Sequence, residues 1–374
     1  MLLENTVAIV HDSCAQNIEA TRVLEEIASM LPNAHIFSTS ALEDGYSSYV
    51  QSRSTKATWM THLPARWMLN RRYVLLNPLA FKALDLSSYE VVISNCAGSA
   101  KSVLQRDGAV HICYCHSPLR LSGQHSDYNH ANEGNGRAPL LLRPLHSGLR
   151  LLDVQSSVQP DYYIAKSHAV ANQIKSRYGR NAFIVHPPID TSRFYGGRSA
   201  DDYLLIVSEL SAHIRVDMAI VACNSMRKRL VIVGDGADRE RLEALSGPTI
   251  HFVGHRTDSE VADLLSRCQA IFCPNMGEEF DTMPLKGNAS GRPAISFAGG
   301  STLETIVDGE TGVLCQECSR PAIVDAIERC VQRSWDPNLL RTYARRFDAA
   351  AFRNKFSSVL GDICGGHLST TAVA

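Results

Sequence analysis

The chain has 374 residues, too many for one ordinary hydrophobic core, and it suits two domains of about 150 to 200 residues each. Its apolar share of 45% and charged share of 20% exclude a disordered chain, and a formal net charge of −1 provides no global field that would attract nucleic acid. No stretch approaches the roughly 18 to 20 apolar residues of a membrane span, and the first residues lack signal-peptide regions, so we expect a cytoplasmic protein, soluble or peripheral on the membrane face.

Short β-branched apolar runs alternate with amphipathic segments, which is typical of parallel sheets covered by helices on both faces. In the first half, helices are expected over Glu19–Met30 and over Ala169–Tyr178, where Ser167 can serve as the N-cap. The strands expected in this half are Val7–His11, His35–Ser38, Val91–Asn95, His111–Tyr114 and Tyr162–Ala165.

A break in the pattern follows, because the proline pair within His186–Asp190 and the small polar residues of Tyr195–Ser199 favour an extended linker. The βα alternation then restarts. The strands expected here are Tyr203–Val207, Leu230–Val233, His251–Val253, Ala270–Cys273, Pro293–Phe297 and Gly312–Leu314. The helices expected between them are Val216–Asn224, Asp238–Ala244, Asp258–Cys268, Leu303–Val307 and Pro321–Gln332.

Two βα arrays joined by a linker predict an α/β fold with two doubly wound, Rossmann-like domains facing a central cleft. We place the domains at residues 1–190 and 200–338. The stretch Leu339–Leu360 has a helical pattern, and we expect a C-terminal helix over residues 339–364 that crosses back to the first domain. The tail Gly365–Ala374 is expected to fray.

The 11 cysteines are scattered rather than arranged as a metal site. Cys113 and Cys115 alternate along an expected buried strand, where cysteine behaves as a small hydrophobic residue. Cys315 and Cys318 form one CxxC without a second pair nearby, so a zinc site would lack two ligands. We expect reduced thiols and no bound metal.

One segment of the first half, Lys56–Ala80, mixes basic and aromatic side chains and contains no acidic residue. This composition suits an anionic membrane surface or a phosphate-linked lipid acceptor. An ordinary solvated helix whose aromatic residues pack inward would have the same composition. The side chains that define this acceptor or membrane side are Trp59, Arg66, Trp67, Arg71 and Arg72.

The most specific pattern is an ordered set of glycine turns in the second half. Each turn lies near the end of an expected strand, the side of a parallel sheet where ligands bind. The Gly299–Gly300 turn, at a helix start, offers free amides to an anion. The turns are Val231–Asp238, His251–Gly254, Ala289–Pro293, Gly299–Thr305 and Asp308–Gly312.

This ordered set, with Cys113–Pro118 and Tyr163–Ser167 in the first half, resembles glycosyltransferase family 4 over roughly Val7 to Leu360. The resemblance implies the B-type glycosyltransferase fold and retaining sugar transfer from a nucleotide-sugar substrate without a metal or other cofactor. It looks closest to bacterial members that act on polysaccharide or lipopolysaccharide intermediates, often with mannose. The implied partners are the nucleotide-sugar donor, a lipid-linked or saccharide acceptor, the inner-membrane surface and a second glycosyltransferase.

The resemblance also assigns roles to individual residues. His116 matches the histidine at the acceptor side of the cleft, and Glu278 matches the first glutamate of the pair that contacts the donor sugar, which makes these two the catalytic candidates. The positions that it places at the donor are Glu209, Arg215, Gly234, Lys286, Gly299, Gly300, Ser301 and Glu304.

Several of these positions depart from the family pattern. Family members place an arginine and a lysine where this chain has Glu209 and Ile214, and a second glutamate where it has Lys286. The glycine after the motif's aromatic residue is Asp281, and the loop Ala15–Glu19 has no glycine. A lost charged hydrogen bond to phosphate costs roughly 1.5 to 3 kcal/mol.

Three hypotheses follow from these matches and departures. The first is an active retaining transferase with a degenerate donor site. The second is a catalytically inactive, transferase-like subunit that binds an acceptor or another transferase, because the replacements gather on the donor side. The third is a transferase whose donor lacks a nucleotide, such as a lipid-phosphate sugar.

Overall fold

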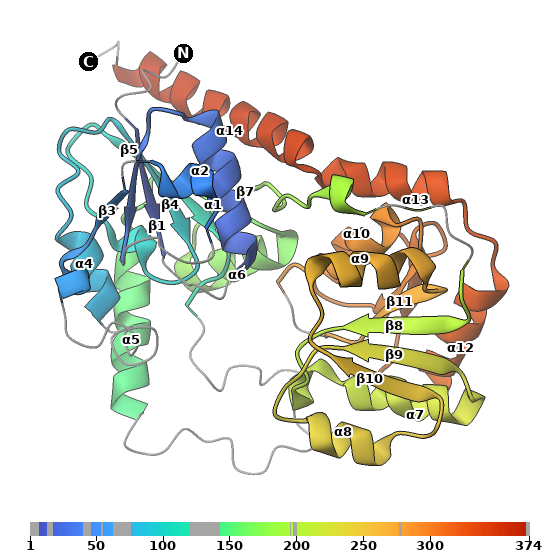
Figure 1. Ribbon diagram of the computed structural model, residues 1–374. Helices are drawn as coiled ribbons and strands as arrows, with labels where there is room; N and C mark the ends of the chain where they lie inside the picture. The colour runs from blue at the N-terminus through green and yellow to red at the C-terminus, as the bar shows by residue number, and fades with distance from the viewer. Residues whose placement is uncertain are drawn as a thin grey trace. The chain divides into compact units, whose positions relative to one another are not determined.

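The computed structural model describes residues 7–12, 18–39, 46–53, 55–62, 76–119, 143–194, 196, 200–276 and 279–371 (Figure 1). The chain divides into two compact units. Unit 1 comprises Met1–Pro188 and Phe352–Ala374, and unit 2 comprises Ile189–Ala351.

Unit 1 is built on a parallel sheet of seven strands in the order β3-β2-β1-β4-β5-β6-β7. The chain moves from β1 outwards to β2 and β3 and then returns to β4, which pairs with the other side of β1. The strand order therefore reverses between β1 and β4, the kind of position where α/β sheets bind ligands. The strands are β1 Val7–His11, β2 His35–Ser38, β3 Thr55–Ala57, β4 Val91–Cys96, β5 Val110–Cys115, β6 Tyr162–Ala165 and β7 Ala182–Ile184.

Helices cover both faces of this sheet because its strands are apolar on both sides. On one face, α1 (Ile18–Met30) and α14 (Ala349–Thr371) pack with side chains such as Leu24 and Phe356. On the other face, α4 (Asn77–Lys82) and α6 (His168–Tyr178) contribute Phe81 and Ile174. The other α-helices in the described part of this unit are α2 Ser48–Gln51 and α5 Arg143–Ser156.

Unit 2 repeats the architecture with six parallel strands in the order β10-β9-β8-β11-β12-β13, and its order reverses between β8 and β11. The strands are β8 Tyr203–Val207, β9 Arg229–Val233, β10 Ile250–Gly254, β11 Ala270–Cys273, β12 Ala294–Phe297 and β13 Gly312–Cys315. The helices are α7 Val216–Met226, α8 Arg239–Leu245, α9 Asp258–Arg267, α10 Met283–Ala289, α11 Thr302–Thr305, α12 Arg320–Gln332 and α13 Pro337–Ala344.

The described residues of unit 2 form three apolar clusters. Helices α7 and α12 pack on one face of the sheet, where Ile220 and Ile327 are fully buried. Helix α9 covers the other face with Leu265. A separate cluster joins α10 to the turn after α13 through Leu285 and Phe347.

The expected fold class is confirmed, since both halves form doubly wound parallel sheets. The N-cap at Ser167 is also confirmed, because its hydroxyl accepts a hydrogen bond from the amide of Val170 at 3.1 Å. The sequence pattern did not reveal β3 and β7, whose three-residue strands lie at the two edges of the first sheet.

The C-terminal region differs from the expectation of one helix over Leu339–Leu360 and a frayed tail. A 3-10 turn at Arg345–Phe347 ends α13, and Asp348 is extended, with its carboxylate accepting the amide of Ala351 at 2.8 Å. That capping bond starts a new helix, α14, which continues to Thr371. None of the helices in the described ranges is both long enough and apolar enough to cross a bilayer.

Candidate functional site

Polar side chains gather at the carboxyl ends of the central strands of unit 1. His11 is the last residue of β1, and its Cα pairs in register with that of Asn95 near the end of β4. His116 directly follows β5, Lys166 directly follows β6, and Glu19 lies in the first turn of α1. We call these five residues the unit 1 network. It lies where the strand order reverses, so the fold itself brings together residues from distant parts of the sequence.

A continuous chain of hydrogen bonds joins the members of the network. Asn95 Nδ2 donates to the carbonyl of Ala20 at 2.8 Å and contacts His11 Nδ1 at 3.0 Å, so the amide oxygen Oδ1 faces His116 Nε2 at 2.6 Å. The other ring nitrogen of His116, Nδ1, lies 3.2 Å from Glu19 Oε1. Lys166 Nζ donates to the same carboxylate oxygen at 2.9 Å.

The electrostatics of the network follow from its burial. His116 is only 1% exposed, and burial lowers the pKa of its imidazole, although the hydrogen bond and charge of Glu19 act in the opposite direction. Burial would also raise the pKa of Glu19, but the charge of Lys166 and the hydrogen bond with His116 outweigh it and lower that pKa to about 2. Burial and the nearby His116 lower the pKa of His11 to about 3.

A backbone turn beside the network binds a carboxylate of the protein itself. Three consecutive amides, those of Ala97, Gly98 and Ser99, donate to the carboxylate of Asp12 at 2.7 to 3.1 Å. The carbonyl of Gly98 in turn accepts from Lys101 Nζ at 2.8 Å. This turn therefore has the geometry of an anion site, and Asp12 occupies it.

In unit 2, Gly234 lies at the end of β9 and allows a close backbone approach. A Cβ at this position would lie 1.9 Å from the carbonyl oxygen of Ser208, and the residue has φ +125°. Gly236 approaches Leu210 in the same way, where a Cβ would lie 2.2 Å from the carbonyl oxygen. The glycine turn thus packs against the segment that carries Glu209, whose side chain is exposed at the end of β8.

Two further positions from the sequence lie directly before α7. Ile214 is 5% exposed and belongs to the apolar core, so its side chain is not available to a donor. Arg215 has φ 59°, a left-handed conformation that is strained for residues other than glycine. Its guanidinium pairs with Asp217, Nε to Oδ1 at 3.1 Å, and the side chain stays 35% exposed.

The Gly299–Gly300 turn follows β12 and lies, like the turns after β8 and β9, at the carboxyl end of its strand. The Gly299 amide donates to Thr302 Oγ1 at 3.3 Å, and Ser301 Oγ accepts the amide of Asp281 at 3.1 Å, so part of the expected anion cradle is engaged within the protein. Apart from Gly299 and its two chain neighbours, no described residue has an atom within 4 Å of a Cβ built on Gly299. Glu304 accepts from Tyr343 Oη through its carbonyl at 3.1 Å.

Lys286 lies in α10 and is half-buried. The remaining expected site residues, Glu278, Arg66, Trp67, Arg71 and Arg72, lie outside the described residues.

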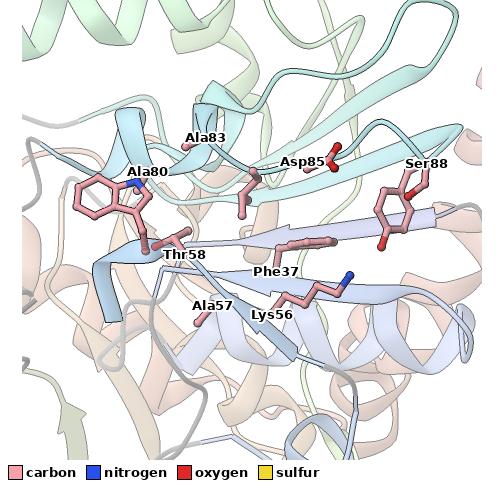
Figure 2. A pocket seen from close by; sticks show the side chains of 11 residues that line it. Phe37, Lys56, Ala57, Thr58, Ala80, Ala83, Asp85 and Ser88 are labelled. Atoms are coloured by element: carbon pink, nitrogen blue, oxygen red, sulfur yellow. The ribbon is translucent and has the colours of Figure 1, made fainter. Parts of the chain in front are cut away.

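Trp59, the described member of the acceptor-side set, lines a pocket of about 370 Å³ at the β3 edge of unit 1. Figure 2 shows Phe37 and Lys56 on the strands, and Ala80 and Ala83 on the opposite side of the pocket. Trp59 is 41% exposed. The segment Lys56–Ala80 begins on a strand rather than in the ordinary helix considered from its sequence.

Sequence reasoning did not single out Asn95 or Lys166 as site residues. One signal could have revealed them: each polar residue comes at or directly after the end of a buried apolar strand. Parallel strands place such ends at one edge of the sheet.

Comparison with known proteins agrees with this architecture. A family model described as glycosyl transferases group 1 matches residues 201–333. The D-inositol 3-phosphate glycosyltransferase of Stackebrandtia nassauensis is 28% identical over 151 residues, which cover 38% of this chain and 33% of that protein. A GDP-mannose-dependent alpha-mannosyltransferase of Mycobacterium tuberculosis is 33% identical over 108 residues, covering 29% and 28%. These two matches span a third or less of each relative, and the chain matches less than half the length of the other curated relatives.

The solved structure of Anabaena HepE in complex with UDP superposes with a TM-score of 0.65, covering 96% of this chain and 100% of that one at 14% identity. This likeness concerns the fold. Most of unit 2 is therefore similar to the glycosyl transferases group 1 family, and the chain as a whole has the fold of the B-type glycosyltransferases.

Proposed function

We propose that this protein is a retaining, metal-independent glycosyltransferase. In this proposal it moves a hexose, such as mannose, from a nucleotide-sugar to a lipid-linked or saccharide acceptor during cell-surface polysaccharide synthesis. The observation that carries the proposal is the match of unit 2 to the group 1 family model. In this unit the turns after β8, β9 and β12 lie at the carboxyl ends of the strands of one parallel sheet, the side where such sheets bind ligands. The mannosyltransferase relative supports the choice of sugar, and the UDP complex of HepE supports a nucleotide-linked donor.

We assign unit 2 to the donor and unit 1 to the acceptor. The acceptor hydroxyl would attack the anomeric carbon on the face from which the diphosphate departs. The new carbon–oxygen bond forms as the bond to phosphate breaks, and a phosphate oxygen takes the hydroxyl proton. Amide dipoles near Gly299 and the guanidinium of Arg215 would stabilise the leaving diphosphate. Glu278 would contact the sugar in this scheme.

The acceptor side would use the pocket that Trp59 lines and the basic segment that follows it. Lys56 Nζ lies 5.6 Å from the centroid of the Phe37 ring, so a cation and an aromatic surface already meet in this pocket. A phosphate-linked lipid or a cytoplasmic membrane surface would suit this combination. We propose peripheral association with that surface on this basis.

A second candidate, an inactive transferase-like subunit, is favoured by one observation. Glu209 is exposed just after the carboxyl end of β8, where its charge would repel a diphosphate. Ile214, which stands where family members have a lysine, is buried in the core. Such a subunit would bind an acceptor or an active transferase. A transferase that uses a lipid-phosphate sugar would also tolerate these replacements.

The purified protein should be incubated separately with UDP-, GDP- and dTDP-sugars and with lipid-phosphate sugars, and both donor hydrolysis and transfer should be measured. Turnover of a nucleotide-sugar supports the first candidate. Turnover of the lipid-phosphate sugar alone supports a transferase whose donor lacks a nucleotide. If the folded protein neither hydrolyses nor transfers from any of these donors and forms a stable complex with an active transferase, it is the inactive subunit instead.

A donor-side variant sharpens this experiment. Lys286→Glu returns the family's glutamate at a half-buried position, whereas a lysine at position 214 would have to leave the apolar core. A gain of turnover in Lys286→Glu indicates a decayed nucleotide site. A loss of turnover indicates that Lys286 serves a donor of another kind.

A further inference from the structure

Both ring nitrogens of His116 face oxygen atoms that can only accept hydrogen bonds. The Asn95 amide cannot be reversed, because its nitrogen already donates to the carbonyl of Ala20 at 2.8 Å, and a reversed amide would bring two oxygens together. The 2.6 Å contact between Asn95 Oδ1 and His116 Nε2 therefore requires a proton on Nε2.

The second contact, between His116 Nδ1 and Glu19 Oε1 at 3.2 Å, also needs a proton. That proton does not belong to Glu19, because Lys166 donates to the same oxygen at 2.9 Å and keeps the carboxylate ionised. A neutral His116 with its proton on Nε2 would direct the Nδ1 lone pair at a carboxylate oxygen. The geometry therefore fits a ring that carries protons on both nitrogens.

The charges that face His116 lead to the same conclusion. Among the described residues, two carboxylates act on His116, Glu19 from α1 and Asp12 after β1, together with one cation, Lys166 after β6. His11 is neutral, since its Nδ1 accepts from Asn95 and its Nε2 contacts Tyr46 Oη at 3.1 Å. A protonated His116 brings this buried group to neutrality, whereas a neutral His116 leaves one negative charge uncompensated.

We propose that Glu19 and Asn95 are positioning residues that hold His116 as a doubly protonated imidazolium at the carboxyl ends of the central strands of unit 1. Both N–H groups of such a ring are engaged by Asn95 and Glu19, so its effect on a bound sugar or phosphate is that of its positive charge. Its part in sugar transfer rests on the proposed function, but its protonation state does not. Burial alone lowers the pKa of His116, and the proposal requires that the two acceptors on its ring nitrogens outweigh that effect.

The protonation state can be measured directly by NMR on protein labelled with ¹⁵N-histidine. The ring signals of His116 are assigned by their loss in His116→Gln. We expect both ring nitrogens to report as protonated between about pH 6 and 8, where an unperturbed histidine loses its charge. A single protonated nitrogen in the folded wild-type protein at pH 7 would overturn the proposal.

Glu19→Gln is the decisive variant, because a glutamine amide can donate to Nδ1 and permits the neutral ring. We expect it to lose the Nδ1 proton signal at pH 7. The matched control is Glu26→Gln, which removes a carboxylate of the same helix that pairs with Arg353. Lys166→Met should leave both ring protons in place, since Glu19 then has His116 as its cation. An unchanged ring in a folded Glu19→Gln protein contradicts the proposal, and if that variant does not fold, the wild-type titration decides.

Activity separates this inference from the proposed function. If transfer is detected, Glu19→Gln should lower kcat by at least about tenfold, with little change in KM, and should move the alkaline limb of the pH profile to lower pH, whereas Glu26→Gln should do neither. If no transfer occurs but both ring nitrogens are protonated, the proposed function fails and the inference stands.

Discussion

Gly234 lies against the backbone of Ser208 so closely that no side chain fits between them. A Cβ on Gly234 would lie 1.9 Å from the carbonyl oxygen of Ser208, and the Ser208 amide donates to Val233 at 3.1 Å. The turn after β9 thereby supports the backbone that carries Glu209. A glycine that resembles a phosphate-binding element in the sequence thus has a demonstrable packing role.

Gly234→Ala should destabilise unit 2 by about 3 kcal/mol or more, because the added methyl group meets backbone atoms and φ +125° is strained for any side chain. Calorimetric unfolding would measure the loss. Gly299→Ala is the control, since no described atom lies within 4 Å of its added carbon, and its cost should be well below that of Gly234→Ala. Equal effects of the two substitutions would show that the close approach is not what matters.

Arg215→Gly should separate stability from donor binding. Glycine relieves the left-handed strain of about 1 kcal/mol, and the larger unfolded-state entropy of glycine offsets part of that gain. We expect stability at or slightly above wild type. Loss of the guanidinium should weaken nucleotide-diphosphate binding by about tenfold or more, as for other charged hydrogen bonds.

The control for Arg215→Gly is Arg227→Gly at the other end of α7. Arg227 also has a left-handed backbone, with φ 51°, but it caps the carboxyl end of the helix. It should show the same relief of strain with unchanged nucleotide binding. Calorimetry of both variants measures their stability on unfolding and their nucleotide binding on titration. Weaker binding in Arg227→Gly would argue against a specific role for Arg215.

Glu209→Arg should strengthen the binding of nucleotide diphosphates. The exposed carboxylate repels a diphosphate, and reversing its charge at a solvated site favours binding by about 1 to 2 kcal/mol, or about tenfold. The gain should shrink as salt screens it. Titration calorimetry at two ionic strengths tests this, with exposed Glu328→Arg in α12 as control. Equal gains in both variants would indicate nonspecific attraction.

Unit 1 should lose stability in mild acid because of its buried histidines. Burial lowers the pKa of His111 from 6.5 to about 3, so its contribution is fully present above pH 6.5 and is lost as the pH falls towards 3. Each pH unit in this range costs about 1.4 kcal/mol, so about 3 kcal/mol is lost between pH 6.5 and 4.

Denaturant unfolding of the wild type and of His111→Gln at several pH values tests this expectation. The slope of unfolding free energy against pH should be smaller in His111→Gln, even if that variant is less stable throughout. His251→Gln replaces an exposed histidine of unit 2 and should leave the slope unchanged. An unaltered slope in His111→Gln would show that this histidine does not drive the acid sensitivity.

Most of the central strands could be predicted from the sequence because their signal is local. Val7–His11, Tyr203–Val207 and Ala270–Cys273 have the predicted bounds, since buried parallel strands are short continuous apolar runs. Edge strands carry less of that signal. Thr55–Ala57 has only three residues, and Ala182–Ile184 includes the exposed Phe183, so neither stands out from a loop.

The alternation of strands and helices, read from the sequence alone, determined that the chain forms two doubly wound sheets, because hydrophobic periodicity acts over a few residues. Only the tertiary structure decided which polar groups meet. His116 contacts Glu19, 97 residues away, and Ile214 enters the core beside a strained arginine. Such partnerships depend on strand order and helix packing, and residues far apart in the sequence carry no local sign of them.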